Sequence, residues 1–462
     1  MKITFSSLLL AALAWGTPLQ VSAAKKAATN NKYAGYLFAY FEGSGNQQEH
    51  LRFAISEDAK NWYALNDNQP VIASDSISTS GGIRDPHILR GEDGCYYIVA
   101  TDMNTVKNGW KDNPGIVLMK SKDLVNWTHS KIVLKEDYKE HFSDAYWVWA
   151  PQTIYDKKAK KYMIYFTLQR TGDGRKSLVT YYAYANKDFT GFESEPKVLF
   201  NAKYGCIDND IIERNGVYHM FYKGNIKNAE GKEIQNGIQQ ATAKNLKGPW
   251  KEDFKFIDAY ADSKTGVEGS GVFKLNDKNE YVLMYDLYGS SRYEYQTSKD
   301  LNTFSTKPES FRKDFFPRHG TVCSVTKDEM ERLQQKWGYV LNRSYTGQGN
   351  PILPGFHADP EILYSNKTGK YYIYSTTDGK PGWGGYKYYV YSSADLKEWK
   401  NEGVALDAKS DQIAWANGNL WAPAAIEVKQ KNGSYKYYLY FSANPNDNGR
   451  KQMGVAVSDS PT

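Results

Sequence analysis

Three acidic residues, Asp85, Asp208 and Glu268, each stand where a strand-like segment of this chain begins. Two carboxyl groups on either side of a bond can hydrolyse it, because one activates water as a base and the other protonates the leaving oxygen as an acid. A third carboxyl group nearby can raise the pKa of the acid so that it holds its proton. If the three residues meet, they supply the groups that acid–base hydrolysis of a glycosidic bond requires.

A short repeated phrase indicates which elements position these residues. It runs from a small residue through Asp or Asn and an apolar residue to an aromatic one, and it follows runs rich in Tyr, Phe and Val that predict β-strands. The copies start 65, 64, 58 and 55 residues apart. Such all-β units must pack against one another to bury both faces. The copies are Ser56–Trp62, Ser121–Trp127, Ala185–Phe192, Ala243–Trp250 and Ser298–Phe304.

The repeat predicts an all-β fold, with a five-bladed β-propeller over residues 34–326. Closure of the ring protects the strand edges. The first strand of each blade then lines a central channel, so carboxylates at the blade starts converge. Blade one lacks an obvious innermost strand, and we expect residues 319–325 to supply it and close the ring. Residues 327–346 are predicted to be a linker with a short helix over 327–336.

A larger repeat begins near residue 347. Asp359-Pro-Glu-Ile-Leu echoes Asp85-Pro-His-Ile-Leu at an offset of 274 residues, and Trp421-Ala-Pro echoes Trp149-Ala-Pro at 272. Residues 347–462 are therefore predicted to be the N-terminal part of a second propeller, about two blades long. Two blades leave an open face, so we expect a fragment of a longer protein. Asp359 is the candidate base of this part, which contains no second acid and is expected to be inert.

The N-terminus and the charge balance bear on compartment and partners. Residues 1–23 predict a signal peptide, with Lys2, an apolar stretch and a small-residue cleavage site ending at Ala23. We therefore expect export to the periplasm or the extracellular space. No later segment is long and apolar enough to predict a membrane span. The net charge of +6 is spread without a basic cluster or nucleic-acid motif, so no nucleic-acid partner is expected.

Cysteine and aromatic content bear on which kinds of site the protein can contain. Cys95, Cys206 and Cys323 are too few and too scattered for a disulfide framework or a zinc site, and at most one pair could form after export. Aromatic residues make up 15% of the chain. Strands favour these residues, and sugar-binding sites stack the flat faces of sugars on them. Core packing is expected to account for most of them.

The motifs together resemble a known family. Arg-Asp-Pro, Trp-Ala-Pro, Ile-Asp-x-x-Ile and Val-Glu-Gly occur in this order on a five-bladed repeat, and Asn350–Pro360 resembles the family's opening. The chain from about residue 34 is thus similar to glycoside hydrolase family 43. The resemblance implies an inverting O-glycosyl hydrolase of the α-L-arabinofuranosidase or β-xylosidase type. Its substrate would be a pentose-containing polysaccharide or oligosaccharide of plant cell walls, from which it removes arabinofuranosyl or xylosyl residues.

The resemblance also assigns roles to the three acidic residues. Asp85 would be the general base, Glu268 the general acid, and Asp208 the carboxylate that orients the sugar and tunes Glu268. Inversion needs space for water, so the carboxyl groups of Asp85 and Glu268 are expected roughly 6.5–9.5 Å apart. In a regular strand Asp208 and Asp210 point to the same face, so the tuning role could belong to Asp210 instead.

Other residues are candidates for binding. Arg84, His87 and Arg292 are candidates for contacts with sugar hydroxyl groups. One of Trp147 and Trp149 is expected to contact the sugar, although both could instead pack between blades.

A single histidine is the candidate for a metal site. His319 resembles the family histidine that faces the central channel and helps to hold an ion there through water. No cofactor is expected to be required, and a structural Ca²⁺ in the channel is the candidate ion.

Two alternatives stay open. A retaining fructan hydrolase of a related five-bladed family also has Arg-Asp-Pro, but it needs an early Asn-Asp-Pro nucleophile and a Glu-Cys acid. Here glycine follows Glu268, and blade one has no Asn-Asp-Pro. A non-catalytic carbohydrate-binding propeller would lose the acid or the base, whereas this chain retains all three candidates.

Overall fold

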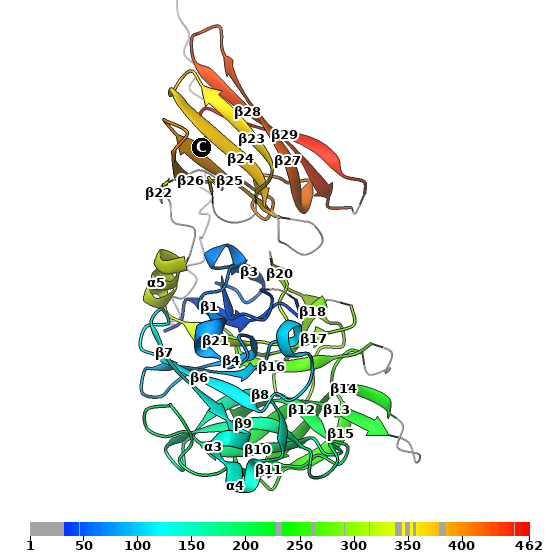
Figure 1. The fold of residues 1–462 in the computed structure, drawn as a ribbon. Coiled ribbons are helices and arrows are strands. Elements are labelled where there is room, and N and C mark those ends of the chain that lie inside the picture. The colour runs from blue at the N-terminus through cyan, green and yellow to red at the C-terminus, as the bar shows by residue number, and fades with distance from the viewer. Residues whose placement is uncertain are drawn as a thin grey trace, which may run out of the picture.

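The computed structural model describes residues 32–45, 47–227, 233–260, 265–290, 292–313, 315–337, 344–346, 352–353, 357–377, 385–447 and 449–462. The predicted signal peptide, residues 1–23, lies outside them. The described residues form the all-β fold that the repeat predicts, with short helices between sheets (Figure 1). No helix among them has the length and apolar character needed to cross a membrane.

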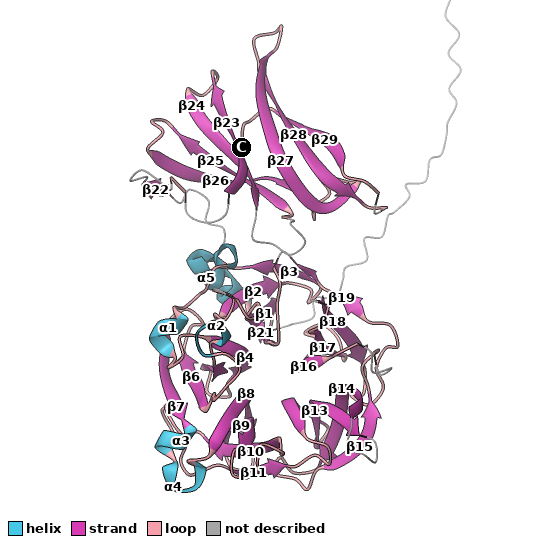
Figure 2. Cartoon of the chain, turned by 45° about the vertical axis from the view of Figure 1, so that its right-hand side comes forward, coloured by secondary structure: helices cyan, strands magenta, loops and turns pink. Residues whose placement is uncertain are grey.

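Four sheets of the first unit, which we define as residues 35–325, share one topology. In each, four antiparallel strands follow one another in chain order, and the first strand lies nearest the centre of a ring (Figure 2). Consecutive hairpins produce this order. The strands are β4 (Ile83–Arg90), β5 (Tyr96–Asp102), β6 (Gly115–Ser121) and β7 (Trp127–Val133); β8 (Ala145–Asp156), β9 (Lys161–Arg170), β10 (Val179–Tyr184) and β11 (Lys197–Phe200); β12 (Cys206–Arg214), β13 (Val217–Lys227), β14 (Glu233–Ala243) and β15 (Lys251–Phe256); β16 (Glu268–Lys274), β17 (Tyr281–Leu287), β18 (Arg292–Ser298) and β19 (Glu309–Ser310).

The fifth sheet of the first unit joins its two ends. Its order is β20-β3-β2-β1-β21, and β1 pairs antiparallel with β21, so that Leu37 lies opposite Cys323. The predicted innermost strand at 319–325 is thereby confirmed as β21, which also contacts β4 and β16 on either side. The ring therefore closes through segments far apart in sequence. The strands are β1 (Gly35–Tyr40), β2 (Arg52–Ser56), β3 (Asn61–Ala64), β20 (Arg312–Lys313) and β21 (Thr321–Val325).

The repeated phrase forms a turn that follows the third strand of a sheet. In its second copy, the amide of Leu124 donates to Oγ of Ser121 over 2.9 Å, and the amide of Asn126 donates to Oδ1 of Asp123 over 2.7 Å. Leu124 has a φ of 68° and is fully buried. The indole of Trp127 donates a 3.1 Å hydrogen bond to the carbonyl of Leu124. The small, acidic, apolar and aromatic positions of the phrase are thus the capping and packing groups of one turn.

The predicted helix is confirmed as α5 (Lys327–Trp337). It buries Met330, Leu333 and Trp337 in the apolar core between the fifth sheet and the sheet of β4 to β7. Its Glu329 accepts a 3.1 Å hydrogen bond from Nη1 of Arg90 on β4. The other helices are short: η1 (Asn66–Asn68), α1 (Ser74–Ile77), α2 (Thr105–Asn108), α3 (Leu134–Asp137) and α4 (Lys139–Phe142).

Residues 344–458 contain two further sheets, which we call the second unit. The orders are β22-β26-β25-β24-β23 and β27-β28-β29. Apolar side chains such as Met453, Val455 and Val457 are exposed on the last strand. The strands are β22 (Ser344–Thr346), β23 (His357–Ser365), β24 (Lys370–Thr377), β25 (Lys387–Ser393), β26 (Glu398–Asp407), β27 (Ala416–Lys429), β28 (Tyr435–Pro445) and β29 (Gln452–Ser458).

The three cysteines are unpaired. Cys206 and Cys323 are buried, and Cys95 is half-buried. Cys206 lies on β12, Cys323 lies on β21 and Cys95 directly precedes β5, so the three cysteines belong to three different sheets.

Candidate active site

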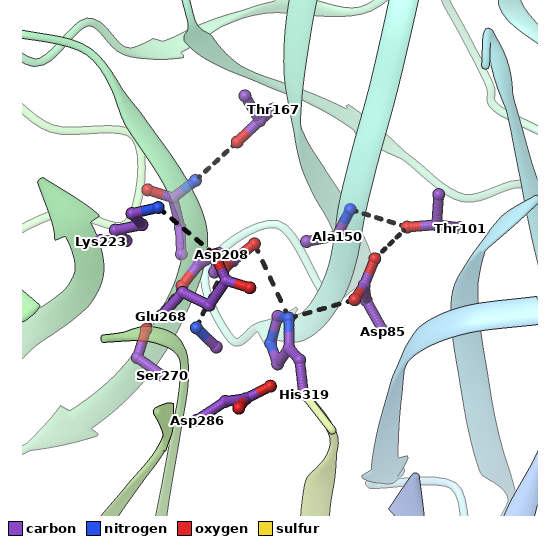
Figure 3. A network of polar contacts seen from close by, with 12 residues as sticks. Asp85, Thr101, Ala150, Thr167, Asp208, Lys223, Glu268, Ser270, Asp286 and His319 are labelled. Carbon is purple, nitrogen blue, oxygen red and sulfur yellow. Dashed lines mark hydrogen bonds and ion pairs between the residues drawn. The ribbon is translucent and has the colours of Figure 1, made fainter. Parts of the chain in front are cut away.

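The three predicted acidic residues lie around one histidine (Figure 3). Nδ1 of His319 is 3.5 Å from Oδ1 of Asp85 and 3.7 Å from Oδ1 of Asp208. The amide of Gly269 donates a 2.9 Å hydrogen bond to Oδ2 of Asp208, which brings the neighbouring Glu268 to the same place. Asp85, Asp208 and Glu268 come from β4, β12 and β16, and His319 stands just before β21. The structure thus gathers residues from four sheets at one end of the inner strands.

A shared backbone feature aims these side chains. Asp85, Ala150, Asp208 and Gly269 have φ values of 50°, 45°, 56° and 68°, and each lies where the register with the next strand shifts. Such a bulge adds a residue to one strand and redirects the side chains around it. Positive φ is uncommon outside glycine, so its recurrence in four inner strands shows that these strands repeat one backbone geometry.

Glycine is required at the bulge of β16. A Cβ on Gly269 would lie 2.9 Å from Cβ of His319 and would also force a side chain into the left-handed region. Ser270 fixes the same turn by donating a 2.6 Å hydrogen bond to the carbonyl of Asp208. The close approach of β16 to His319 therefore depends on this glycine.

Asp85 is held as a carboxylate. Thr101 Oγ1 donates a 2.8 Å hydrogen bond to its Oδ2, and the amide of Ala150 donates to the same hydroxyl over 2.8 Å. Burial opposes ionisation of Asp85, but His319, Arg84 and Thr101 favour the charged form and hold its pKa below the usual value. Asp85 can therefore accept a proton from water.

His319 carries the positive charge at the centre of the cluster. Burial alone would lower its pKa, but the carboxylates of Asp208 and Asp85 raise it to about 9. Burial and the charges of Glu268 and Asp85 raise the pKa of Asp208 to about 6, although His319 opposes the change. One imidazolium thus compensates two buried carboxyl groups of different proton affinity.

Glu268 has two cationic neighbours that the sequence did not indicate. Its Oε2 lies 3.3 Å from Nζ of Lys223, and its Oε1 lies 3.3 Å from Nη2 of Arg318. A quarter of the Glu268 side chain is exposed, so it can be reached from solvent. Arg318 directly precedes His319, and that adjacency was the available signal. Lys223 stands in the middle of β13 in a run without a motif.

The bulge in β12 separates Asp208 from Asp210. The strand is not regular there, so the two carboxyl groups have different neighbours. Oδ2 of Asp210 accepts a 2.6 Å hydrogen bond from the amide of Val272, and Oδ1 lies 4.0 Å from Nε2 of His87. Burial raises the pKa of Asp210 to about 7. Asp208, in contact with His319, is therefore the carboxyl group that belongs to the cluster with Asp85.

His87 is not among the groups of this cluster. Its ring is 7% exposed, and its Nδ1 accepts a 3.3 Å hydrogen bond from the amide of Thr153. Burial, together with the charge of His319, lowers its pKa to about 3, so the ring is neutral. These contacts place His87 in the wall between two inner strands, and its contact with a sugar stays a prediction.

Arg84 is part of an aromatic cluster beside Asp85. Its guanidinium lies 4.6 Å from the ring centre of Phe41 and 4.8 Å from that of Trp110, and Nη1 is 2.9 Å from Oε1 of the buried Glu49. Stacking and the ion pair fix the guanidinium in one orientation. Arg84 thus contributes a fixed positive charge next to Asp85.

The two predicted tryptophans stack on each other. The ring centres of Trp147 and Trp149 are 3.9 Å apart with an angle of 14° between the planes, and both side chains are partly exposed. Trp110, which is 53% exposed, lies 6.2 Å from Trp149, edge to face. Sequence reasoning missed Trp110 because it lies outside the strands, in the segment after α2. The three rings form an aromatic surface near Arg84.

Arg292 is the first residue of β18 and makes different contacts. Its Nη1 is 3.4 Å from Glu294, its guanidinium lies 5.5 Å from the ring centre of Tyr260, and half of the side chain is exposed. The arginine that contacts the acid candidate is Arg318. Arg292 contacts Glu294 on its own strand and Tyr260, and its contact with sugar hydroxyl groups stays a prediction.

The resemblance implied an ion near His319, and the side chains do not fit one that protein binds directly. In the described part of the chain, no three His, Cys, Asp or Glu side chains are grouped so as to hold a metal. Nδ1 of His319 faces two carboxylates, and the ring stays protonated up to about pH 9. A protonated nitrogen has no lone pair for a metal. An ion held through water stays a prediction.

Two family models match this chain. The model described as "Probable glycosyl hydrolase domain" covers residues 31–331, and the model described as "Glycosyl hydrolases family 43" covers residues 348–462. The chain belongs to glycoside hydrolase family 43. The resemblance drawn from the four motifs is thereby confirmed.

Two relatives show how far the similarity to this family 43 chain extends. An alpha-L-arabinofuranosidase from Bifidobacterium longum subsp. longum is 27% identical over 294 residues, which are 54% of this chain and 27% of that enzyme. A 1,2-beta-oligomannan phosphorylase from Thermoanaerobacter sp. is 30% identical over 96 residues, which are 21% of this chain and 30% of that enzyme. The aligned part thus spans less than a third of each of these relatives.

Among solved structures, this chain is similar to an endo-1,4-beta-xylanase from Bacteroides thetaiotaomicron. It is 17% identical, with a TM-score of 0.43, and the match covers 60% of this chain and 93% of that one. A second is a family 43 subfamily 1 enzyme from Xanthomonas citri in complex with xylotriose, at 14% identity and a TM-score of 0.37. That match covers 79% of this chain and 91% of the other.

Proposed function

We propose that this protein is an exported, inverting glycoside hydrolase that removes arabinofuranosyl or xylosyl residues from plant cell-wall polysaccharides or oligosaccharides. The observation that carries the proposal is the meeting of Asp85, Asp208 and Glu268 around His319. Bringing several carboxyl groups together in a partly buried place is costly, and proteins retain such clusters where chemistry needs them. Export is supported by the signal-like pattern of residues 1–23.

Asp85 is the base in this proposal. Its carboxylate takes a proton from water while the water oxygen attacks the anomeric carbon, and the C–O bond to the leaving group breaks on the opposite face. Thr101 on β5 holds Oδ2 of Asp85 by a hydrogen bond, so Oδ1 is the oxygen that takes the proton. The configuration at the anomeric carbon inverts, and Asp85 ends the step protonated.

Glu268 is the acid. It gives its proton to the glycosidic oxygen as the C–O bond breaks, and it ends the step as a carboxylate. Lys223 and Arg318, both 3.3 Å away, stabilise that carboxylate. The charge of Asp208 acts in the other direction, because a negative neighbour favours the protonated form of Glu268 before the transfer.

The substrate class is supported by two kinds of observation. The exposed rings of Trp110 and the Trp147–Trp149 stack offer flat apolar faces of the kind that bind sugars. The Bifidobacterium relative is named as an alpha-L-arabinofuranosidase, which favours an arabinofuranosyl group over a xylosyl one.

The test compares release of 4-nitrophenol from the α-L-arabinofuranoside and the β-D-xyloside by the parent protein, Asp85→Asn and Glu268→Gln. We expect activity from the parent and a loss of at least about 100-fold in Asp85→Asn. Glu268→Gln should lose little on 4-nitrophenyl glycosides, which need little acid assistance, and much on arabino-oligosaccharides. Glu213→Gln is the matched control, because Glu213 lies on β12 but pairs at the surface with Lys157.

Proton NMR of the first product formed from an arabino-oligosaccharide decides between inversion and retention. An inverted anomer supports the proposal, and a retained one contradicts it. A parent protein that binds these sugars without cleaving them would instead support the non-catalytic alternative. Arabinan, arabinoxylan and xylo-oligosaccharides, compared in one panel, identify the preferred pentose and linkage.

A further inference from the structure

Arg318 is shared by two carboxylates of the sheet formed by β16, β17, β18 and β19. Its Nη2 lies 3.3 Å from Oε1 of Glu268, and its Nε donates to Oδ2 of Asp286. Glu268 on β16 and Asp286 on β17 are directly paired across the two strands. One guanidinium therefore bridges a cross-strand pair of like charges, which would otherwise repel each other.

The two carboxylates differ in their access to solvent. The side chain of Asp286 is 1% exposed, whereas that of Glu268 is 25% exposed. Oδ1 of Asp286 is buried and accepts no hydrogen bond from the described residues. Burial raises the pKa of Asp286 to about 7, although Arg318 opposes the change. Asp286 is thus too enclosed to touch a sugar, and Arg318 is the side chain through which it can act.

Glu268 needs a compensating negative charge. Lys223 and Arg318 contact its two oxygens, and Lys223 also lies 4.7 Å from the ring centre of Tyr288. Two adjacent cations favour the carboxylate, yet a general acid must be protonated before it acts. Asp208, His319 and Asp286 also interact electrostatically with Glu268.

We propose that Asp286 is a positioning residue that draws the charge of Arg318 away from Glu268, so that Glu268 can hold the proton it delivers to the leaving sugar. The proposal rests on the proposed role of Glu268 as the acid. It assigns to Asp286 an effect on the proton donor that acts through Arg318. The base, Asp85, accepts a hydrogen bond from Thr101 on β5.

The experiment measures kcat/KM against pH for the parent, Asp286→Asn and Arg318→Gln. In Asp286→Asn, Arg318 keeps its charge and its contact with Glu268 but loses its partner on β17, so the guanidinium acts more strongly on Glu268. We expect the alkaline limb to move down by about 1 pH unit. In Arg318→Gln the cation is gone, and the limb should move up by a similar amount. Opposite shifts from two partners of one ion pair are not expected from general destabilisation.

A series of aryl glycosides provides a second readout. Loss of acid assistance slows substrates with poor leaving groups and spares those with good ones. For Asp286→Asn near the parent's optimum, we expect a loss on the order of tenfold with phenyl glycosides and less than about twofold with 2,4-dinitrophenyl glycosides. Glu294→Gln is the matched control, because Glu294 is a buried carboxylate of the same sheet that pairs with Arg292 instead. It should leave the limb and the leaving-group dependence unchanged.

The outcomes separate this proposal from the proposed function. If Glu268→Gln retains full activity on poor leaving groups, the assignment of the acid is wrong. If Glu268→Gln is inactive there while Asp286→Asn keeps the parent's pH limb and leaving-group dependence, Asp286 has no such role and the hydrolase stands. If Asp286→Asn does not fold, Arg318→Gln decides, since an unchanged or lowered alkaline limb overturns the proposal.

Discussion

Thr101 donates a 2.8 Å hydrogen bond to Asp85, and the same hydroxyl accepts one of 2.8 Å from the amide of Ala150 on the neighbouring sheet. The second unit repeats this arrangement. Thr376 donates a 3.0 Å hydrogen bond to Asp359, and its hydroxyl accepts one of 2.8 Å from the backbone of β27. Two sheets are thus joined through a threonine at the same point in both units, which ties the orientation of the acidic side chain to the packing of adjacent sheets.

Replacing Thr101 by valine should impair the base. Valine keeps the shape but removes the donor to Asp85, so the pKa of Asp85 rises and the acid limb of kcat/KM moves to higher pH. We expect kcat/KM to fall roughly tenfold, and the unpaired Ala150 amide to cost about 1–3 kcal/mol of stability. Thr101→Ser should behave like the parent in both assays. If serine and valine have equal effects, the methyl group and not the hydrogen bond is responsible.

Asp208→Asn tests which carboxyl group tunes the acid. Asp208 places a negative charge beside Glu268, and removing this charge should move the alkaline limb of kcat/KM to lower pH. We expect kcat on an arabino-oligosaccharide to fall by roughly 10- to 100-fold. Asp210→Asn is the matched control two residues away. A shift of the alkaline limb in Asp210→Asn alone would transfer the tuning role to Asp210.

His319 makes folding stability depend on pH. Its folded pKa of about 9 lies above its ordinary value of 6.5. Protonated His319 therefore stabilises the fold fully below about pH 6.5, and this contribution is lost as the pH rises through about 9. The melting temperature of the parent should exceed that of His319→Asn by several degrees at pH 6, and by less at pH 9.5. A constant difference between the two proteins would show that His319 acts by packing alone.

Trp62, on β3, tests how much the core of the fifth sheet contributes to stability. It is fully buried, and its ring lies edge to face with Phe38 and Phe311 at centre distances of 5.4 and 5.9 Å. Trp62→Ala should destabilise the protein by about 3–5 kcal/mol, measured by urea unfolding with tryptophan fluorescence and circular dichroism. Trp110→Ala removes the same side chain from an exposed position, and it should change stability by less than about 1 kcal/mol.

The repeat explains why much of the ring could be predicted from sequence. Asp123 and Leu124 form a turn through contacts within a few residues, and such local chemistry is visible in a linear string. The unpaired apolar strand at 319–325 indicated where the ring closes, because a strand without a sequential partner must find a distant one.

The partners of individual charged side chains could not be predicted in this way. Arg292 and Arg318 both lie near the sheet of β16 to β19, and only the packed structure decides that Glu294 pairs with the first while Glu268 and Asp286 share the second. Side-chain reach across strands depends on register and twist, which neighbouring residues in sequence do not encode individually.

The order of motifs determined the all-β ring, the family and the identity of Asp85, Asp208 and Glu268 as acidic residues at inner strands. The tertiary structure decided how charge is distributed among them, because burial and the positions of His319 and Arg318 set the proton affinities. It also separated Asp208 from Asp210, through a left-handed residue that breaks the two-residue period of the strand. Electrostatic energy depends on distances in space, and those distances exist only once the ring has closed.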